Sequence, residues 1–249
     1  MLKYEIFTEL KDLTKNNSFG FAFVWAFGTF IRELLKSVYI PNIPKMKKTH
    51  RFIAIMALMT IATLAFKPAI NPELEIGAPI PKAGVKMKDV SGKDISLADV
   101  KKDKGLLVIF SCNTCPFVKL SESRIKELTT EATKNNIGVI IINSNEAQRG
   151  DEDSFDAMKE YAKEQGYTCS YVVDKNSEVA DAFGATRTPH CFLFDKKGLV
   201  YRGAIDDNVK DSDAAKEHYL KDAIEAVVKG TEVKTNSTKS VGCGIKRLG

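Results

Sequence analysis

The chain has 249 residues, which is enough for one sizeable domain with extensions. Its apolar content of 44% and charged content of 28% are ordinary for a globular protein with a buried core, so the fold does not need to depend on disulfides. The net charge of +5 arises in residues 1–68, which hold ten Lys or Arg and four Asp or Glu. The remaining residues hold 27 Lys or Arg and 28 Asp or Glu, so the globular part is nearly neutral. This balance excludes the basic face of a folded nucleic-acid-binding domain.

Residues 46–68 have the layout of a secretory signal. A basic start, Met46-Lys47-Lys48, precedes an apolar run over residues 52–66, and Thr63 and Ala65 offer a small-x-small cleavage site. This run is shorter than the roughly 18 residues that a membrane span needs. We therefore predict a signal peptide or a short membrane anchor, and an exported protein of the periplasm or cell envelope.

Residues 1–45 lie upstream of this segment and include a second apolar run, residues 20–31. Two interpretations remain open. Either Met46 is the true start and residues 1–45 are not translated, or they form a real extension with two membrane-associated segments.

From residue 69 to residue 230 the chain is predicted to be globular, with strands first. Residues 85–88 and 95–97 alternate on either side of the turn signal Ser91-Gly92, which predicts a β-hairpin. Residues 106–110 and 137–142 are continuous apolar runs, typical of strands that are buried on both faces. Three further strands are predicted over residues 171–173, 190–194 and 199–205.

Helices are predicted between these strands. The first runs from the cysteine pair to about residue 135, and Asp153 is expected to cap the second. A short helix over residues 178–183 ends at Gly184, and a last apolar face from Leu220 to Val228 ends at Gly230. Strands that alternate with helices indicate an α/β fold with a central, partly parallel sheet. Residues 231–249 are predicted to form an irregular tail.

Cys112 and Cys115 form a Cys-x-x-Cys motif between a buried strand and a helix. The partial positive charge and free N–H groups of a helix N-terminus stabilise a thiolate and lower the cysteine pKa. This motif predicts a redox-active pair, in which Cys112 attacks a disulfide and Cys115 resolves the mixed disulfide. A structural zinc site would need a second Cys or His pair at ligand spacing, and the sequence has none, so no metal or cofactor is predicted.

Three further cysteines stand outside the motif. Cys169 and Cys191 are expected to be small buried residues. Cys243 lies between two glycines in the predicted tail, where it is either an alternative resolving thiol or an idle one.

The combined pattern resembles the thioredoxin-like superfamily, and more closely its redoxin and peroxiredoxin-like group. The resemblance rests on the motif Cys-Asn-Thr-Cys-Pro-Phe at 112–117, on Thr188-Pro189 before a strand, and on the closing hairpin. It implies a central mixed sheet flanked by helices, with an N-terminal β-hairpin extension. It also implies that Pro189 is cis and faces the cysteine pair, and that the backbone at Thr188 docks substrate by strand-like hydrogen bonds.

The resemblance also marks where this chain differs from peroxiredoxins. If Cys115-Pro116 is matched to their Cys-Pro, the position of their threonine holds Cys112, and the nearest candidate for their activating arginine, Arg187, is shifted. His190, beside Pro189, is expected close to the cysteine pair. Two thiolates and an imidazole are soft ligands that suit Cu(I).

The main hypothesis is therefore an exported thiol–disulfide oxidoreductase. Its partners would be thiols or disulfides of proteins or small molecules, together with an electron donor or acceptor that the sequence does not identify. A peroxiredoxin-like peroxidase is the first alternative, and a Cu(I)-binding metallochaperone is the second. The apolar N-terminal segment is a possible membrane tether.

Overall fold

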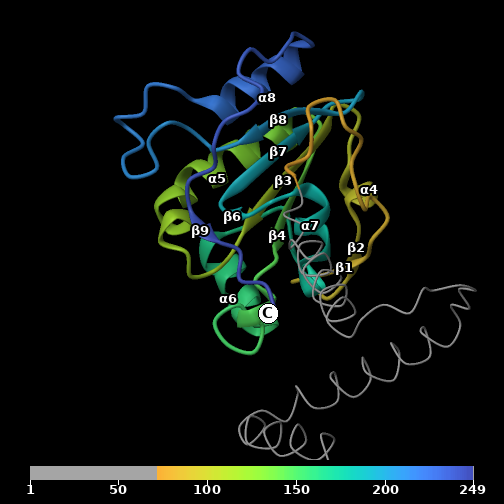
Figure 1. The fold of residues 1–249 in the computed structure, drawn as a ribbon, viewed down its shortest axis with the longest axis vertical. Helices are drawn as coiled ribbons and strands as arrows, with labels where there is room; N and C mark the ends of the chain where they lie inside the picture. Colours follow the sequence, from red (N-terminus) through yellow and green to blue (C-terminus); the bar gives the residue numbers. More distant parts are fainter. Residues whose placement is uncertain (1–71, 249) are drawn as a thin grey trace, which may run out of the picture. The chain divides into compact units, whose positions relative to one another are not determined.

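The computed structural model describes residues 72–248 (Figure 1). The predicted upstream extension and the predicted signal or anchor, residues 1–45 and 46–68, lie outside these residues. Over residues 72–248, none of the helices has both the length and the apolar character that crossing a membrane requires.

A seven-stranded sheet with the order β2-β1-β5-β4-β3-β7-β8 forms the centre of the domain. The strands are β1 (Met87–Asp89), β2 (Asp94–Ile95), β3 (Gly105–Ser111), β4 (Ile137–Asn143), β5 (Ser170–Val173), β7 (His190–Phe194) and β8 (Leu199–Gly203). The pairs β3–β4 and β4–β5 are parallel, whereas β1, β7 and β8 pair antiparallel with their neighbours. The predicted mixed sheet of an α/β fold is thus confirmed.

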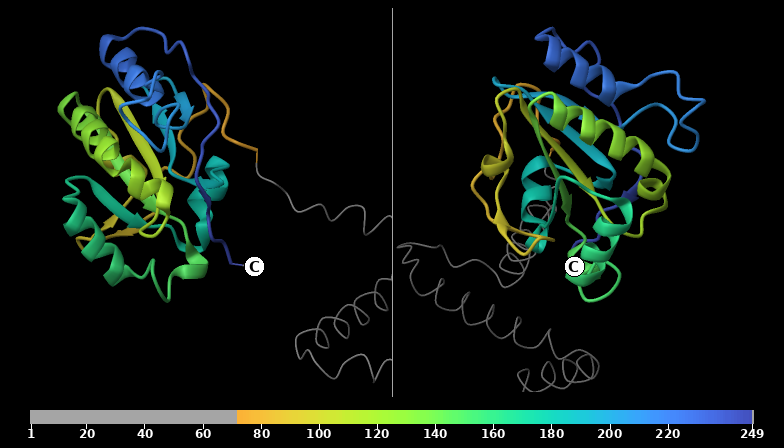
Figure 2. Two further views of the ribbon diagram at one scale, coloured as in Figure 1. Left: turned by 90° about the vertical axis from the view of Figure 1, so that its left-hand side faces the viewer. Right: turned by 180° about the vertical axis from the view of Figure 1, so that it is seen from behind.

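Helices cover both faces of this sheet (Figures 1 and 2). One face packs against α5 (Pro116–Lys134), α6 (Phe155–Gln165) and α8 (Tyr219–Lys229). The other face packs against α4 (Leu97–Val100) and α7 (Glu178–Phe183). Because both faces are covered, every residue of β3 and β4 is buried, which explains why these strands are continuous apolar runs. Successive residues of a strand point to opposite faces, so the odd-numbered Leu107 and Ile109 pack under α5 and Phe110 packs on α7.

The predicted N-terminal hairpin is β1 and β2, paired antiparallel with Met87 opposite Ile95. Leu97 was expected to continue the second strand, but it begins helix α4 instead. Ser96 and Asp99 form a capping box there, since the Ser96 side chain accepts from the Asp99 N–H and the Asp99 carboxylate accepts from the Ser96 N–H. This local cap explains why the strand pattern stops at Ile95.

The C-terminal tail is largely irregular, as predicted, but it contains one strand that the sequence did not reveal. Strand β9 (Cys243–Gly244) pairs antiparallel with β6 (Arg187–Thr188), the two residues that precede Pro189. Figure 1 shows this blue segment running beside β6. Ile245, the next residue, is buried in the cluster under α7. The tail is therefore part of the packed domain.

We predict that Gly105→Ala destabilises the domain by about 1–3 kcal/mol, the usual cost of overpacking. Gly105 has a φ of 146°, and a Cβ there would overlap the main-chain carbonyl oxygen of Phe194 on the neighbouring strand. Urea denaturation would measure the change. Gly84→Ala is the matched control, because a Cβ at Gly84 meets nothing within 4 Å. Equal stability of the two variants would contradict the prediction.

Candidate active site

Strand β3 ends at Ser111, and Cys112 follows at once. Helix α5 begins at Pro116, so Cys115 is its N-cap residue. Proline is well suited to this first position because it has no N–H to leave unpaired and its φ is already helical. Both cysteines are buried, with 2% and 3% of their surfaces exposed. They belong to the hydrophobic cluster on the α5 face of the sheet.

Thr188 brings the two cysteines into one cluster. The Cys112 Sγ lies 3.4 Å from the Thr188 hydroxyl oxygen, and the Cys115 Sγ lies 3.1 Å from the Thr188 carbonyl oxygen. The Thr188–Pro189 peptide bond is cis. The cis bond implied by the resemblance is thus confirmed, and Thr188 lies at the cysteine pair.

The two thiols make different contacts with Thr188. Burial opposes a negative charge on either thiol, and because the two belong to one buried cluster, only one of them readily becomes a thiolate. The Cys115 thiol donates to the Thr188 carbonyl oxygen, which can only accept, so this contact keeps the proton on Cys115. The Thr188 hydroxyl can donate to a thiolate at Cys112. Which of the two thiols carries the charge stays a prediction.

The loop between the cysteines is tied to a buried carboxylate, Asp153. Its Oδ1 accepts from the Asn113 N–H at 2.9 Å and from the Asn143 amide at 2.7 Å, and its Oδ2 accepts from the Asn145 amide at 2.8 Å. The Tyr171 hydroxyl donates to the Asn113 side chain at 2.8 Å. All five side chains are buried. This network fixes the position of the loop that carries Cys112.

Asp153 was expected to cap a helix, and that prediction is wrong. Ser154 is the N-cap of α6, and its side chain accepts from the Ala157 N–H. Both residue types are good caps, so the sequence alone did not separate them. The sequence analysis did not identify Asp153, Asn113 or Tyr171 as parts of the site, because their contacts join residues that are far apart in the chain.

Two predicted site residues do not reach the cysteines. His190 is fully buried, but it stacks on Phe192 with ring centroids 4.5 Å apart, on the α7 face of the sheet. Burial, with a smaller effect of the Arg202 charge, lowers the pKa of its imidazole to about 4. Arg187 is exposed and donates to the main-chain carbonyl of Gly242 at 2.9 Å.

The placement of His190 bears on the copper alternative. A Cu(I) site would need the imidazole and the two thiols together, whereas the sheet separates them. Within residues 72–248, no three His, Cys, Asp or Glu side chains are grouped so that they could hold a metal ion.

Residues 76–202, about half of the chain, match the AhpC/TSA family. The chain belongs to the AhpC/TSA family. Among curated proteins, the thiol-disulfide oxidoreductase ResA of Geobacillus thermodenitrificans is 24% identical over 162 residues, which cover 62% of this chain and 87% of ResA.

Two solved structures are more similar in sequence. A hypothetical protein of Sinorhizobium meliloti is 32% identical, with a TM-score of 0.65, and the match covers 71% of this chain and 97% of that one. An uncharacterized conserved protein of Geobacillus kaustophilus is also 32% identical, with a TM-score of 0.63 and coverage of 72% and 93%. The predicted membership of the thioredoxin-like redoxin group is confirmed, and the chain is an oxidoreductase.

The other cysteines of this AhpC/TSA chain occupy different surroundings. Cys191 lies fully buried in β7, and burial raises its pKa well above the usual range. Cys169 is half-buried, and burial raises its pKa to about 12. Neither thiol contacts Cys112 or Cys115 through a hydrogen bond in the described residues, as expected for structural cysteines. Cys243, by contrast, pairs with Thr188 in the β6–β9 ladder and packs against the cluster that holds the pair.

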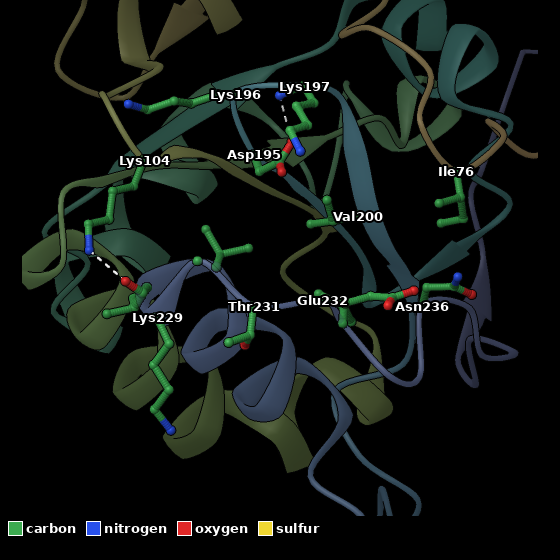
Figure 3. A pocket seen from close by; sticks show the side chains of 14 residues that line it. Ile76, Lys104, Asp195, Lys196, Lys197, Val200, Lys229, Thr231, Glu232 and Asn236 are labelled. Carbon is green, nitrogen blue, oxygen red and sulfur yellow. Dashed lines mark hydrogen bonds between the residues drawn. The ribbon is translucent and has the colours of Figure 1, made fainter.

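An open pocket lies elsewhere on the domain, between the β7–β8 turn and the end of α8 (Figure 3). Lys104, Lys196 and Lys229 surround it, and the Lys104 ammonium donates to the carbonyl oxygen of Val228 at 2.8 Å. None of its lining residues is a cysteine or belongs to β6. The pocket therefore lies apart from the cysteine site.

We predict that the thiolate of the reduced protein belongs to Cys112, because the Thr188 hydroxyl can donate to its sulfur, whereas Cys115 donates to a carbonyl oxygen. Thiolate absorbance in the ultraviolet should persist in Cys115→Ser and should be absent at neutral pH in Cys112→Ser. Cys169→Ser is the control. A neutral-pH thiolate that survives in Cys112→Ser would assign the charge to Cys115 instead.

Proposed function

We propose that the chain is an exported thiol–disulfide oxidoreductase that works by dithiol–disulfide exchange at Cys112 and Cys115. The observation that carries this proposal is the pair of thiols beside the start of α5, which both contact Thr188, one at its hydroxyl and the other at its carbonyl oxygen. Exchange requires a thiolate that attacks and a second thiol that resolves. The similarity to ResA, which is named a thiol-disulfide oxidoreductase, supports the same reaction class.

In the proposed cycle, the Cys112 thiolate attacks one sulfur of a partner disulfide. The partner S–S bond breaks, one partner thiolate leaves, and Cys112 forms a mixed disulfide with the other half. Cys115 then loses its proton and attacks the Cys112 sulfur, which releases the second partner thiolate and closes the Cys112–Cys115 disulfide. Two electrons pass from the enzyme to the partner, and the reverse steps oxidise a dithiol.

This order gives the attack to Cys112, as the motif suggests. The contact of Cys115 with the Thr188 carbonyl oxygen supports it, because an oxygen that can only accept keeps the proton on Cys115. Thr188 and Pro189 are proposed to position the partner, because the main chain at Thr188 lies against Cys115 and can pair with an extended segment. The partners are thiols or disulfides of proteins or small molecules.

Peroxide reduction is the second candidate function. Family membership and a cysteine followed by proline at a helix start favour it. Two features count against it. Cys112 stands where the peroxiredoxin threonine is expected, and Arg187 bonds the tail instead of a reacting group.

We predict that the full chain accelerates the reduction of a protein disulfide by dithiothreitol. The double variant Cys112→Ser/Cys115→Ser should fall to the rate of dithiothreitol alone, because exchange needs the thiols of this pair. Turbidity of reduced insulin would follow the reaction.

Cys169→Ser should keep the wild-type rate, because Cys169 does not contact the pair. The main proposal would be wrong if the protein does not reduce the insulin disulfides but consumes hydrogen peroxide saturably with dithiothreitol as the thiol donor. That result would favour the peroxidase.

Export is proposed from residues 46–68 alone, by the order of their basic and apolar segments. We predict that residues 1–68, fused to a reporter enzyme that is active only after export, give reporter activity. Residues 46–68 alone should suffice if Met46 starts the protein.

Leu58→Arg is the matched control for export, because a charge in the apolar run should abolish it. A fusion that remains inactive and cytoplasmic with the natural segment would contradict export.

A further inference from the structure

The C-terminal tail occupies the strand edge beside the redox pair. Cys243 lies opposite Thr188 and Gly244 lies opposite Arg187 in the antiparallel β6–β9 pair. Gly242 lies so close to the cis peptide that a Cβ there would overlap the carbonyl oxygen of Thr188. Main chain thus packs directly on main chain, as it does when an extended segment adds to a sheet edge.

Contacts on both sides of Cys243 hold the tail in this position. Before it, the Arg187 guanidinium donates to the Gly242 carbonyl at 2.9 Å. After it, the Ile245 N–H donates to the Thr186 carbonyl at 3.0 Å, and the Lys246 N–H donates to the Asn145 side chain at 2.9 Å. The place of Cys243 is therefore set by its neighbours and not by its own side chain.

Cys243 lies at the cysteine pair through Thr188. It pairs with Thr188, whose carbonyl oxygen lies 3.1 Å from the Cys115 sulfur, and it packs against the cluster that contains Cys112 and Cys115. Cys169 and Cys191 also belong to or pack against this cluster, but neither pairs with Thr188. Three thiols therefore meet around Thr188, and one of them, Cys243, comes from a segment that is remote in sequence from the other two.

We propose that Cys243 is a third redox-active residue, held by the tail strand in the position of a docked substrate cysteine, and that it forms a disulfide with Cys115. This inference rests on the proposed exchange function. It also means that the tail strand must leave β6 before a partner protein can pair with the same edge.

The chemistry uses only a disulfide as oxidant. The Cys115 thiolate attacks a disulfide, one thiolate leaves, and a mixed disulfide with Cys115 remains. Cys243 loses its proton and its thiolate attacks the Cys115 sulfur, which expels the second thiolate. The products are a Cys115–Cys243 disulfide and two released thiols, so two electrons have passed from the two cysteines to the oxidant.

The first test uses the full chain with Cys112→Ser, so that Cys243 is the only neighbour left to resolve Cys115. Glutathione disulfide is added, and the adduct at Cys115 is followed by mass spectrometry of the trapped protein. We expect the adduct to disappear with formation of a Cys115–Cys243 crosslink. Its lifetime should be at least about ten-fold shorter than in Cys112→Ser/Cys243→Ser, because a tethered thiol acts at millimolar effective concentration or above.

Cys112→Ser/Cys169→Ser is the matched control and should behave like Cys112→Ser. Equal adduct lifetimes with and without Cys243 would overturn the inference. The wild-type protein separates this failure from failure of the proposed function. If it still forms the Cys112–Cys115 disulfide and reduces insulin, only the role of Cys243 is lost; if it does neither, both proposals fall.

The second test leaves all cysteines of the Cys112→Ser background in place and changes the tail strand instead. Gly242→Ala places a Cβ against the Thr188 carbonyl oxygen, so it should displace the tail strand from β6. The effective concentration of the Cys243 thiol at Cys115 then falls, and the Cys115–Cys243 crosslink should form at least about ten-fold more slowly. Gly244→Ala is the control, because its Cβ would meet only the Thr186 carbonyl oxygen at 4.0 Å. Equal crosslinking rates in the two variants would contradict docking of the tail as the cause.

Discussion

Contact with Thr188 is the constraint on which the arrangement of the site depends. Its hydroxyl lies beside the Cys112 sulfur, its carbonyl oxygen lies beside the Cys115 sulfur, and its main chain pairs with Cys243. Thr188 is itself only 1% exposed, so these contacts form in a region from which water is largely excluded. Burial makes a second negative charge costly, and for this reason one thiol is favoured as the thiolate and its neighbours keep their protons.

A second constraint connects the cysteine loop to the tail. The Asp153 carboxylate accepts from the Asn113 N–H in the loop and from the Asn145 amide, and the carbonyl of that same amide accepts from the Lys246 N–H in the tail. If the tail leaves β6, the Asn145 carbonyl loses its partner in a buried position, which costs free energy unless water or a partner segment replaces it. The docked tail and the position of the Cys112 loop therefore stabilise each other.

The sequence predicted most of the sheet and the helices because their signals are local. Buried strands such as residues 137–142 are continuous apolar runs, and Gly184 and Gly230 end their helices in left-handed conformations. The cysteine pair and Thr188 were found through a short motif and a resemblance. Asp153 and the strand at Cys243 were not found, because a buried carboxylate network and a two-residue strand depend on segments far apart in the chain. His190 was predicted on the wrong face of the sheet, although the alternation of a strand gives the right one. Cys191 faces the cluster of the cysteine pair, so the preceding residue, His190, must face the other side of the sheet.

The two thiols differ through the atoms of Thr188 that they meet. Proline cannot donate a main-chain hydrogen bond, so it is best tolerated in the first turn of a helix, and Pro116 takes the first position of α5. Cys115 is thereby the N-cap, and its thiol donates to the Thr188 carbonyl oxygen. Cys112 lies three residues before it, in the loop held by Asp153, where its sulfur meets the Thr188 hydroxyl, which can donate to a thiolate. One residue therefore offers an acceptor to one thiol and a donor to the other, and this difference favours the negative charge on Cys112.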